Sequence, residues 1–274
     1  MHTIRFSAIL MILLGLLSSC EKVIDLKLNN SAPQTVIEGT VSNEAGGAKV
    51  SISLSKKFTD DSSFEGISGA QVTVEADGTI YNFDPTATGV YQNATLVGIP
   101  GHTYHLTVKL NDKTYTSTST MPQIVKLDSI YVVDDELSTN KDKTKLRIAV
   151  VKYQDPANVQ NYYRFIEYID GRKEKSLFID EDEFTNRQTV NSRLNFNNDN
   201  DDPAREIRTG KTLMVEMECI DAAVYKYLFS LNSGSTGNDN NAAPSNPTSN
   251  ITGGVLGYFS AYPITRKTIT VPAN

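Results

Sequence analysis

Apolar and polar residues alternate with a period of two over most of the region 35–120. Val50, Ile52 and Leu54, for example, fall on one face, as in a strand with one buried side. Asp77-Gly78 stands between two alternating runs and predicts a hairpin, because both residues tolerate a positive φ. About seven short strands separated by turn residues predict an antiparallel β-sandwich.

The alternation stops at Met121-Pro122, which predicts a domain boundary because Pro cannot donate to a sheet ladder. Strand patterns resume after it, and residues 161–169 are apolar on both faces, as in a central strand. Asp170-Gly171 predicts a second hairpin. We therefore expect a β-sandwich domain over 35–122 and a second β-rich domain over 123–274.

One helix is predicted in the second domain. Asp221 suits the N-cap and Gly234 the C-terminal end. Between them, apolar residues recur at the helical spacing i, i+3, i+4 and i+7, at Val224, Tyr227, Leu228 and Leu231. A long polar loop, 233–250, follows, and loops of this length are typical of functional or disordered segments.

The start of the chain has the pattern of a lipoprotein leader. Residues 1–19 combine a basic start at Arg5 with a short apolar run, as in a signal peptide. The run is shorter than the roughly 18 residues of a membrane-spanning helix. It ends in Leu-Ser-Ser-Cys, which resembles a bacterial lipobox, so Cys20 is predicted to carry the lipid. Residues 20–34 are then a tether, and Glu21 in place of Asp favours the outer membrane, on its periplasmic or cell-surface face.

The chain is acidic, with 26 Lys and Arg against 32 Asp and Glu and a formal net charge of −6. This balance argues against a nucleic-acid partner, whose phosphates need clustered cations. It also argues against electrostatic attachment to an anionic bilayer. Membrane attachment is therefore assigned to the lipid on Cys20.

Cysteine usage leaves no disulfide. The chain has two cysteines, and if the lipid occupies Cys20, only Cys219 remains. Its apolar neighbours predict a small core residue. No His follows it in the chain, so a nucleophilic role is not expected.

The sequence contains no catalytic constellation, and we expect no metal and no cofactor. His102 and His105, three apart on a strand, point to opposite faces, unlike the paired histidines of helical zinc sites. The acidic runs 180–183 and 199–202 lack the spacing of a calcium loop and are interpreted as solvated loops. Ser233 has no downstream His for a triad. A carboxylate pair for glycan hydrolysis stays open, because its members meet only in space.

One modification site is a candidate. Asp128-Ser129-Ile130 matches the short pattern for O-glycosylation of exported Bacteroidetes proteins, with Ser129 as the acceptor. The same residues also serve simply to open a strand.

Two resemblances follow from the motifs. Gly69-Ala70-Gln71-Val72 and Gly89-Val90-Tyr91 resemble elements of the transthyretin-like or carboxypeptidase-regulatory sandwich of bacterial surface proteins, which usually serves as a structural or interaction domain. This resemblance implies a transthyretin/Ig-like β-sandwich. Together with the lipobox and the tail Asn-Ile-x-Gly-Gly-x-x-Gly-Tyr-Phe over 250–259, the chain resembles the Bacteroidetes outer-membrane lipoproteins classed as a domain of unknown function, type 4249. That resemblance implies a TonB-dependent outer-membrane receptor as a partner and assigns no catalytic residues.

The leading expectation is a lipid-anchored accessory protein that acts by binding, not by catalysis, with the loop 233–250 and the segment 251–262 as contacts. A second hypothesis is a glycan-binding surface lipoprotein, since tyrosines of the second half could stack on sugars. A third is a glycan hydrolase with a carboxylate pair in the second domain.

Overall fold

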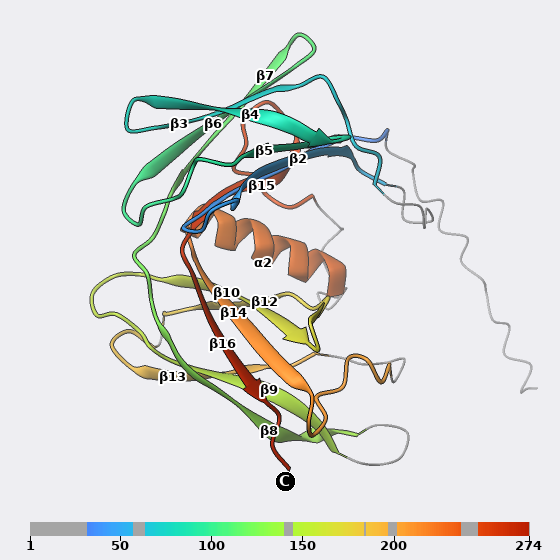
Figure 1. Cartoon of the computed structure of the whole chain (residues 1–274), viewed down its shortest axis with the longest axis vertical. Helices are drawn as coiled ribbons and strands as arrows, with labels where there is room; N and C mark the ends of the chain where they lie inside the picture. The colour runs from blue at the N-terminus through green and yellow to red at the C-terminus, as the bar shows by residue number, and fades with distance from the viewer. Residues whose placement is uncertain are drawn as a thin grey trace, which may run out of the picture. The chain divides into compact units, whose positions relative to one another are not determined.

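The computed structural model describes residues 32–56, 64–139, 145–183, 185–196, 202–236 and 246–273. The first sheet has eight strands in the order β15-β1-β2-β5-β4-β3-β6-β7 (Figure 1). These strands are β1 (Thr35–Ser42), β2 (Ala48–Leu54), β3 (Gln71–Ala76), β4 (Thr79–Ala87), β5 (Val90–Asn93), β6 (Thr103–Leu110), β7 (Lys113–Thr120) and β15 (Leu256–Tyr262).

The alternation found in the sequence creates the core of this sheet. Residues at every second position, such as Ile37, Val50 and Leu106, are at most 1% exposed. The hairpin predicted at Asp77-Gly78 is confirmed, with both residues at positive φ and Ala76 paired with Thr79. The first half of the chain therefore folds around one hydrophobic cluster, as the pattern predicts.

One strand of the first sheet comes from the other end of the chain. β15 pairs with β1 in parallel, and Gly257 lies opposite Ile37 in the register. A Cβ on Gly257 would lie 2.0 Å from the backbone oxygen of Ile37. Only glycine permits this close approach, so the register depends on it.

The segment before β15 is fixed by the side chain of Asn250. Its Nδ2 donates to the Phe259 carbonyl at 2.8 Å, and its Oδ1 accepts from the Phe259 amide at 2.9 Å. Ser117 on β7 donates to the Asn250 carbonyl. Phe259 is fully buried, so the motif over residues 250–259 helps to pack the core of the first sheet.

The second half of the chain forms two further sheets. One contains β10 (Tyr162–Ile169), β11 (Arg172–Lys173), β12 (Phe178–Glu181), β14 (Thr212–Ile220) and β16 (Ile264–Thr270). The other contains β8 (Leu127–Thr139), β9 (Lys145–Gln154) and β13 (Thr189–Leu194). Aromatic side chains such as Tyr153, Tyr163 and Phe165 are buried in their common core.

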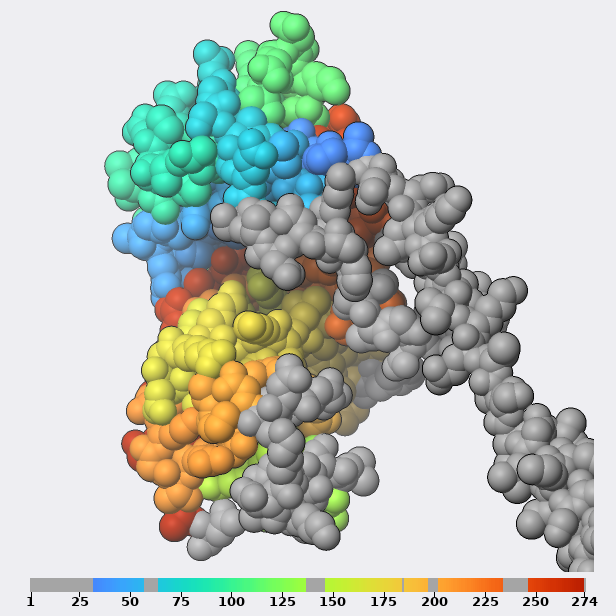
Figure 2. Space-filling model, turned by 90° about the vertical axis from the view of Figure 1, so that its right-hand side faces the viewer, coloured from blue at the N-terminus to red at the C-terminus, as the bar shows by residue number. Residues whose placement is uncertain are grey.

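The fold class is confirmed: the described chain is mainly β, with the single helix α2 (Ala222–Thr236) among the described residues. The hairpin at Asp170-Gly171 is also confirmed, between β10 and β11. The chain leaves the first sheet close to Met121-Pro122, and the domain boundary there stays a prediction. In Figure 2, residues near the C-terminus, in red, lie between first-half residues in blue and second-half residues in yellow.

The helix begins as predicted. The Oδ1 of Asp221 accepts from the Val224 amide at 2.9 Å, which is an N-cap. Ser119 on β7 donates to the other oxygen of Asp221 and accepts from the Ala261 amide on β15 at 2.8 Å. The predicted end at Gly234 is wrong, because the helix continues to Thr236.

A substitution at Gly257 tests the role of the β1–β15 contact. Gly257→Ala should lower the free energy of unfolding by at least about 2–3 kcal/mol, because the added Cβ collides with the β1 backbone. Gly254→Ala is the matched control. Gly254 also has a positive φ but open space around its Cβ, so it should cost only about 1 kcal/mol. Urea denaturation measures both, and equal losses would contradict the proposed contact.

Candidate functional site

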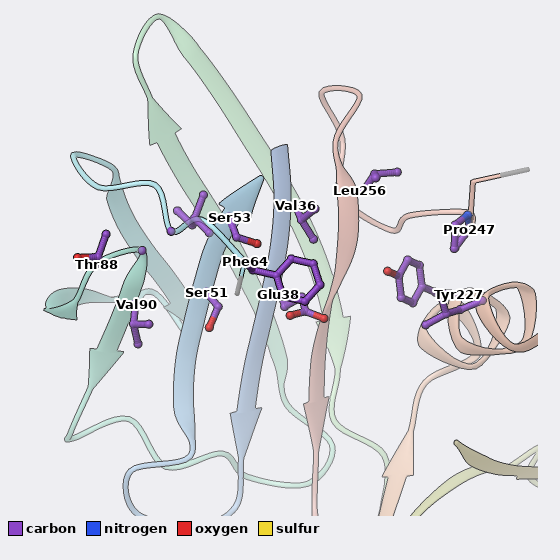
Figure 3. A pocket seen from close by; sticks show the side chains of 14 residues that line it. Val36, Glu38, Ser51, Ser53, Phe64, Thr88, Val90, Tyr227, Pro247 and Leu256 are labelled. Carbon is purple, nitrogen blue, oxygen red and sulfur yellow. The ribbon is translucent and has the colours of Figure 1, made fainter. Parts of the chain in front are cut away.

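A groove lies between the outer face of the first sheet and helix α2 (Figure 3). Its volume is about 480 Å³. Strands of the sheet contribute Val36, Glu38, Ser51, Ile52, Ser53, Val90 and Leu256. The turns and loops beside it contribute Phe64, Gly66, Thr88, Gly89 and Pro247, and the helix contributes Tyr227 and Leu231. The walls are mostly apolar, although they face solvent.

The period of two explains which side chains face the groove. On β1, Ile37 points into the core, and its neighbours Val36 and Glu38 point outward. Leu256 on β15 lies opposite Val36 in the register, so it belongs to the same outer face. On the helix, Leu231 is one turn beyond Tyr227, which places both on the side facing the sheet.

Two groove residues are large, apolar and exposed. The exposed fraction is 65% for Phe64 and 42% for Leu231. Burying such side chains against a partner stabilises a complex by about 1.5–3 kcal/mol each. The groove is therefore suited to an apolar ligand surface.

A second hollow of about 430 Å³ adjoins the groove, because Glu38 and Leu231 line both. Its wall carries charged groups, including Arg164, Lys173 and Glu174. The two hollows thus combine an apolar surface with a polar one that has charges of both signs.

Arg164 lines this charged hollow and is held by two contacts. Its guanidinium lies 3.4 Å from Glu218 on the neighbouring strand and 3.5 Å from the hydroxyl of Tyr258. Burial raises the pKa of the Glu218 carboxyl, and the positive charge of Arg164 opposes that rise. Tyr258 packs on Tyr227 of α2 with ring centroids 5.0 Å apart. This cluster joins the helix to both the first and second sheets.

A short row of aromatic rings follows the other side of the helix. The centroids of Tyr162 and Tyr225 are 4.9 Å apart, and those of Tyr225 and Phe229 are 6.0 Å apart. Phe229 is 54% exposed, and the other two are partly exposed. Rings in this arrangement can stack on sugars.

Two carboxylates near the charged hollow, Glu174 and Glu167, lack properties that a glycosidase acid needs, and the hydrolase hypothesis stays a prediction. A general acid needs a raised pKa and contact with substrate. Burial would raise the pKa of Glu174, but hydrogen bonds from Arg205 and Ser176 lower it overall. Burial raises the pKa of Glu167 to about 8, yet Glu167 is completely inaccessible.

The predicted site residues have different outcomes. Cys20 lies outside the described residues, so the lipid attachment stays a prediction. Ser129 is exposed near the start of β8, which is an edge strand. It lies beside a register shift in the pairing of β8 with β9. Its glycosylation also stays a prediction. Cys219 is confirmed as a core residue: it is 2% exposed, and burial raises the pKa of its thiol to about 11.

The two histidines contact different groups. His102 lies 2.5 Å from Asp77 in the β3–β4 turn. His105 lies 3.0 Å from the hydroxyl of Thr118 on β7.

The interpretation of the run 180–183 as a solvated loop is wrong, because Asp180 and Glu181 belong to strand β12 and are only partly exposed, and Asp182 is buried. Asp182 is only 2% exposed, because backbone pairing with Asn161 draws it inward. In the run 199–202, Asp202 forms an ion pair with Arg172 at 3.1 Å, and the preceding residues lie outside the described part.

The segment 251–262 contributes Leu256 to the groove, and its expected role as a contact surface stays a prediction. Most of it is buried within the first sheet, and only residues 252–254 are exposed. Residues 237–245 of the expected loop 233–250 lie outside the described residues. No helix in the described part of the chain is long and apolar enough to cross a membrane.

Sequence reasoning missed the groove. Val36 and Glu38 occupy the outward positions of an alternating strand, and this alternation predicts that they lie on an exposed face of the sheet. No local pattern indicates that a helix from residues 222–236 packs beside that face. Phe64 has no periodic context that would single it out.

Two comparisons with known proteins bear on the chain. A family model described as Domain of unknown function (DUF4249) matches residues 21–268. No curated protein matches the sequence.

The buried carboxyl of Glu167 predicts how the free energy of unfolding depends on pH. Its folded-state pKa is raised to about 8, so the folded protein holds a proton that the unfolded chain releases near its ordinary pKa. Its contribution to stability is therefore complete at low pH and is lost as the pH rises from about 4.5 to 8, by at most about 1.4 kcal/mol per pH unit. Glu167→Gln should make urea-derived unfolding free energies less dependent on pH over this range.

Glu65→Gln, at an exposed loop position, is the control and should leave the pH dependence unchanged. A Glu167→Gln profile parallel to the wild-type profile would show that this carboxyl does not titrate on unfolding.

Proposed function

Given that the chain belongs to the family described as Domain of unknown function (DUF4249), we propose that it is a lipid-anchored accessory protein that binds a partner at the bacterial cell envelope. The groove between the first sheet and α2 carries this proposal. Its apolar walls, with Phe64 and Leu231 exposed, are typical of a surface that a partner covers.

The proposed partner is a TonB-dependent outer-membrane receptor. The resemblance to Bacteroidetes lipoproteins, which are often encoded beside such receptors, supports this choice. Glu38 lies at the junction of the apolar groove and the charged hollow. A receptor segment with apolar side chains and one Lys or Arg opposite Glu38 would complement both features.

The proposed anchor and the groove are compatible in distance. Lipid on Cys20 would hold the chain at the outer membrane, and β1 begins at Thr35. The intervening tether would span up to about 50 Å if it were fully extended. The groove could therefore reach a receptor in the same membrane.

A second candidate function is glycan binding, favoured by the row of Tyr162, Tyr225 and Phe229. Glycan titration of the purified protein separates this function from protein binding. Aromatic stacking would require Phe229, whereas the receptor hypothesis requires Phe64 and Leu231.

The first prediction of this proposal concerns the groove. Phe64→Asp and Leu231→Asp should each reduce recovery of the receptor at least about tenfold, because a charge in an apolar contact is costly to bury. The measurement is affinity isolation of the protein from native outer membranes, with mass spectrometry of what accompanies it.

Ile99→Asp is the matched control, since Ile99 is 52% exposed and does not line the groove. It should leave recovery unchanged. Equal loss in the control, or full recovery with the groove variants, would overturn the role of the groove. Absence of any receptor with the wild-type protein would overturn the proposed partner.

The second prediction concerns the anchor. Cys20→Ala should move the protein from the membrane fraction to the soluble fraction, because lipid would no longer be attached. Its melting temperature should match that of the wild-type protein, since residue 20 precedes the first strand. A variant that stays in the membrane fraction would show that the lipid is not the anchor.

A further inference from the structure

Two loops at one end of the second-half core are joined by backbone hydrogen bonds. The loop 155–161 follows β9, and the loop 182–188 follows β12. The Asp155 amide donates to the Gln188 carbonyl at 2.9 Å, and the Asp182 amide donates to the Asn161 carbonyl at 3.3 Å. These bonds bring acidic residues from separate parts of the sequence together.

The two aspartates are buried and incompletely satisfied. The exposed fraction is 1% for Asp155 and 2% for Asp182. The Oδ2 atoms of both, and the buried Oγ1 of Thr185 in the second loop, have no hydrogen-bond partner among the described residues. The other oxygen of Asp155 accepts from the Tyr163 hydroxyl. Buried oxygens of this kind need a donor or a cation.

The local charge is also uncompensated. Asp180 lies at the same place, 3.4 Å from the Tyr153 hydroxyl. Within the described residues, no ion pair involves Asp155, Asp180 or Asp182. Buried charges in proteins are normally paired or bind a metal ion.

We propose that Asp155, Asp182 and Thr185 bind one calcium ion that joins the two loops. Calcium takes carboxylate, carbonyl and water oxygens in a flexible set of six to eight, which suits a site made of two loops. Magnesium demands stricter octahedral geometry. The described residues contain no group of three or more His, Cys, Asp or Glu able to hold a metal by side chains alone. Backbone carbonyls and water must therefore complete the coordination.

The ion would fix one end of the aromatic row. Asn161, which accepts from the Asp182 amide, directly precedes Tyr162, and Tyr162 pairs with Glu181 between β10 and β12. Calcium would thus hold the strand ends that position Tyr162 against Tyr225 of the helix.

Calcium titration of the full-length protein in detergent tests the proposal. After chelator treatment, calcium should bind at one saturable site in calorimetry. It should raise the melting temperature by about 5–10 °C at a concentration a hundredfold above Kd. Terbium, a calcium substitute, should show emission sensitised by Tyr163 or Tyr153 and displaced by calcium.

Asp155→Asn and Asp182→Asn should abolish this binding. Their melting temperatures in chelator report whether they fold. Glu183→Gln is the matched control, because Glu183 belongs to the same acidic run but is exposed, and it should bind normally. No saturable binding, a thermal shift reproduced by sodium at equal ionic strength, or binding that survives both Asp→Asn changes would overturn the proposal.

Discussion

The structure depends on the parallel contact between β1 and β15, where the backbone of Gly257 lies against that of Ile37. This contact places residues from the end of the chain inside the first sheet. Since β15 follows α2 and precedes β16 of the second-half sheet, the same contact also determines where the helix lies. The groove exists because the helix packs on the outer side of β15 and leaves the neighbouring face of β1 and β2 open.

Buried polar side chains hold β15 and the helix in this arrangement. Ser119 is 1% exposed and hydrogen-bonds both the helix cap at Asp221 and the backbone of β15. The side-chain amide of Asn250 makes two hydrogen bonds to the backbone of Phe259, as the backbone of a paired strand residue would. Buried polar groups satisfied in this way specify one packing, because any other would leave them unpaired. Gly257 and Asn250 of the tail motif thus have structural roles.

The sequence predicted features that depend on near neighbours. Period-two alternation identified the strands of the first half, Asp77-Gly78 identified a hairpin, and Asp221 identified the helix cap. Contacts between segments far apart in the sequence could not be predicted in this way. The parallel pairing of β15 with β1 has no local signal, and neither has the pairing of loop 155–161 with loop 182–188. The groove and the buried position of Asp182 both arise from such contacts, so neither could be predicted.

The order of the strands has a consequence for how the protein is made. Synthesis proceeds from the N-terminus, so the seven strands β1 to β7 are complete long before β15 emerges. Until then, the edge of β1 that receives β15 has unpaired amide and carbonyl groups, and such an edge can pair with other chains. Contacts over such sequence separations form slowly. At the edge of β1, pairing with another chain therefore competes with correct folding until the last strands arrive.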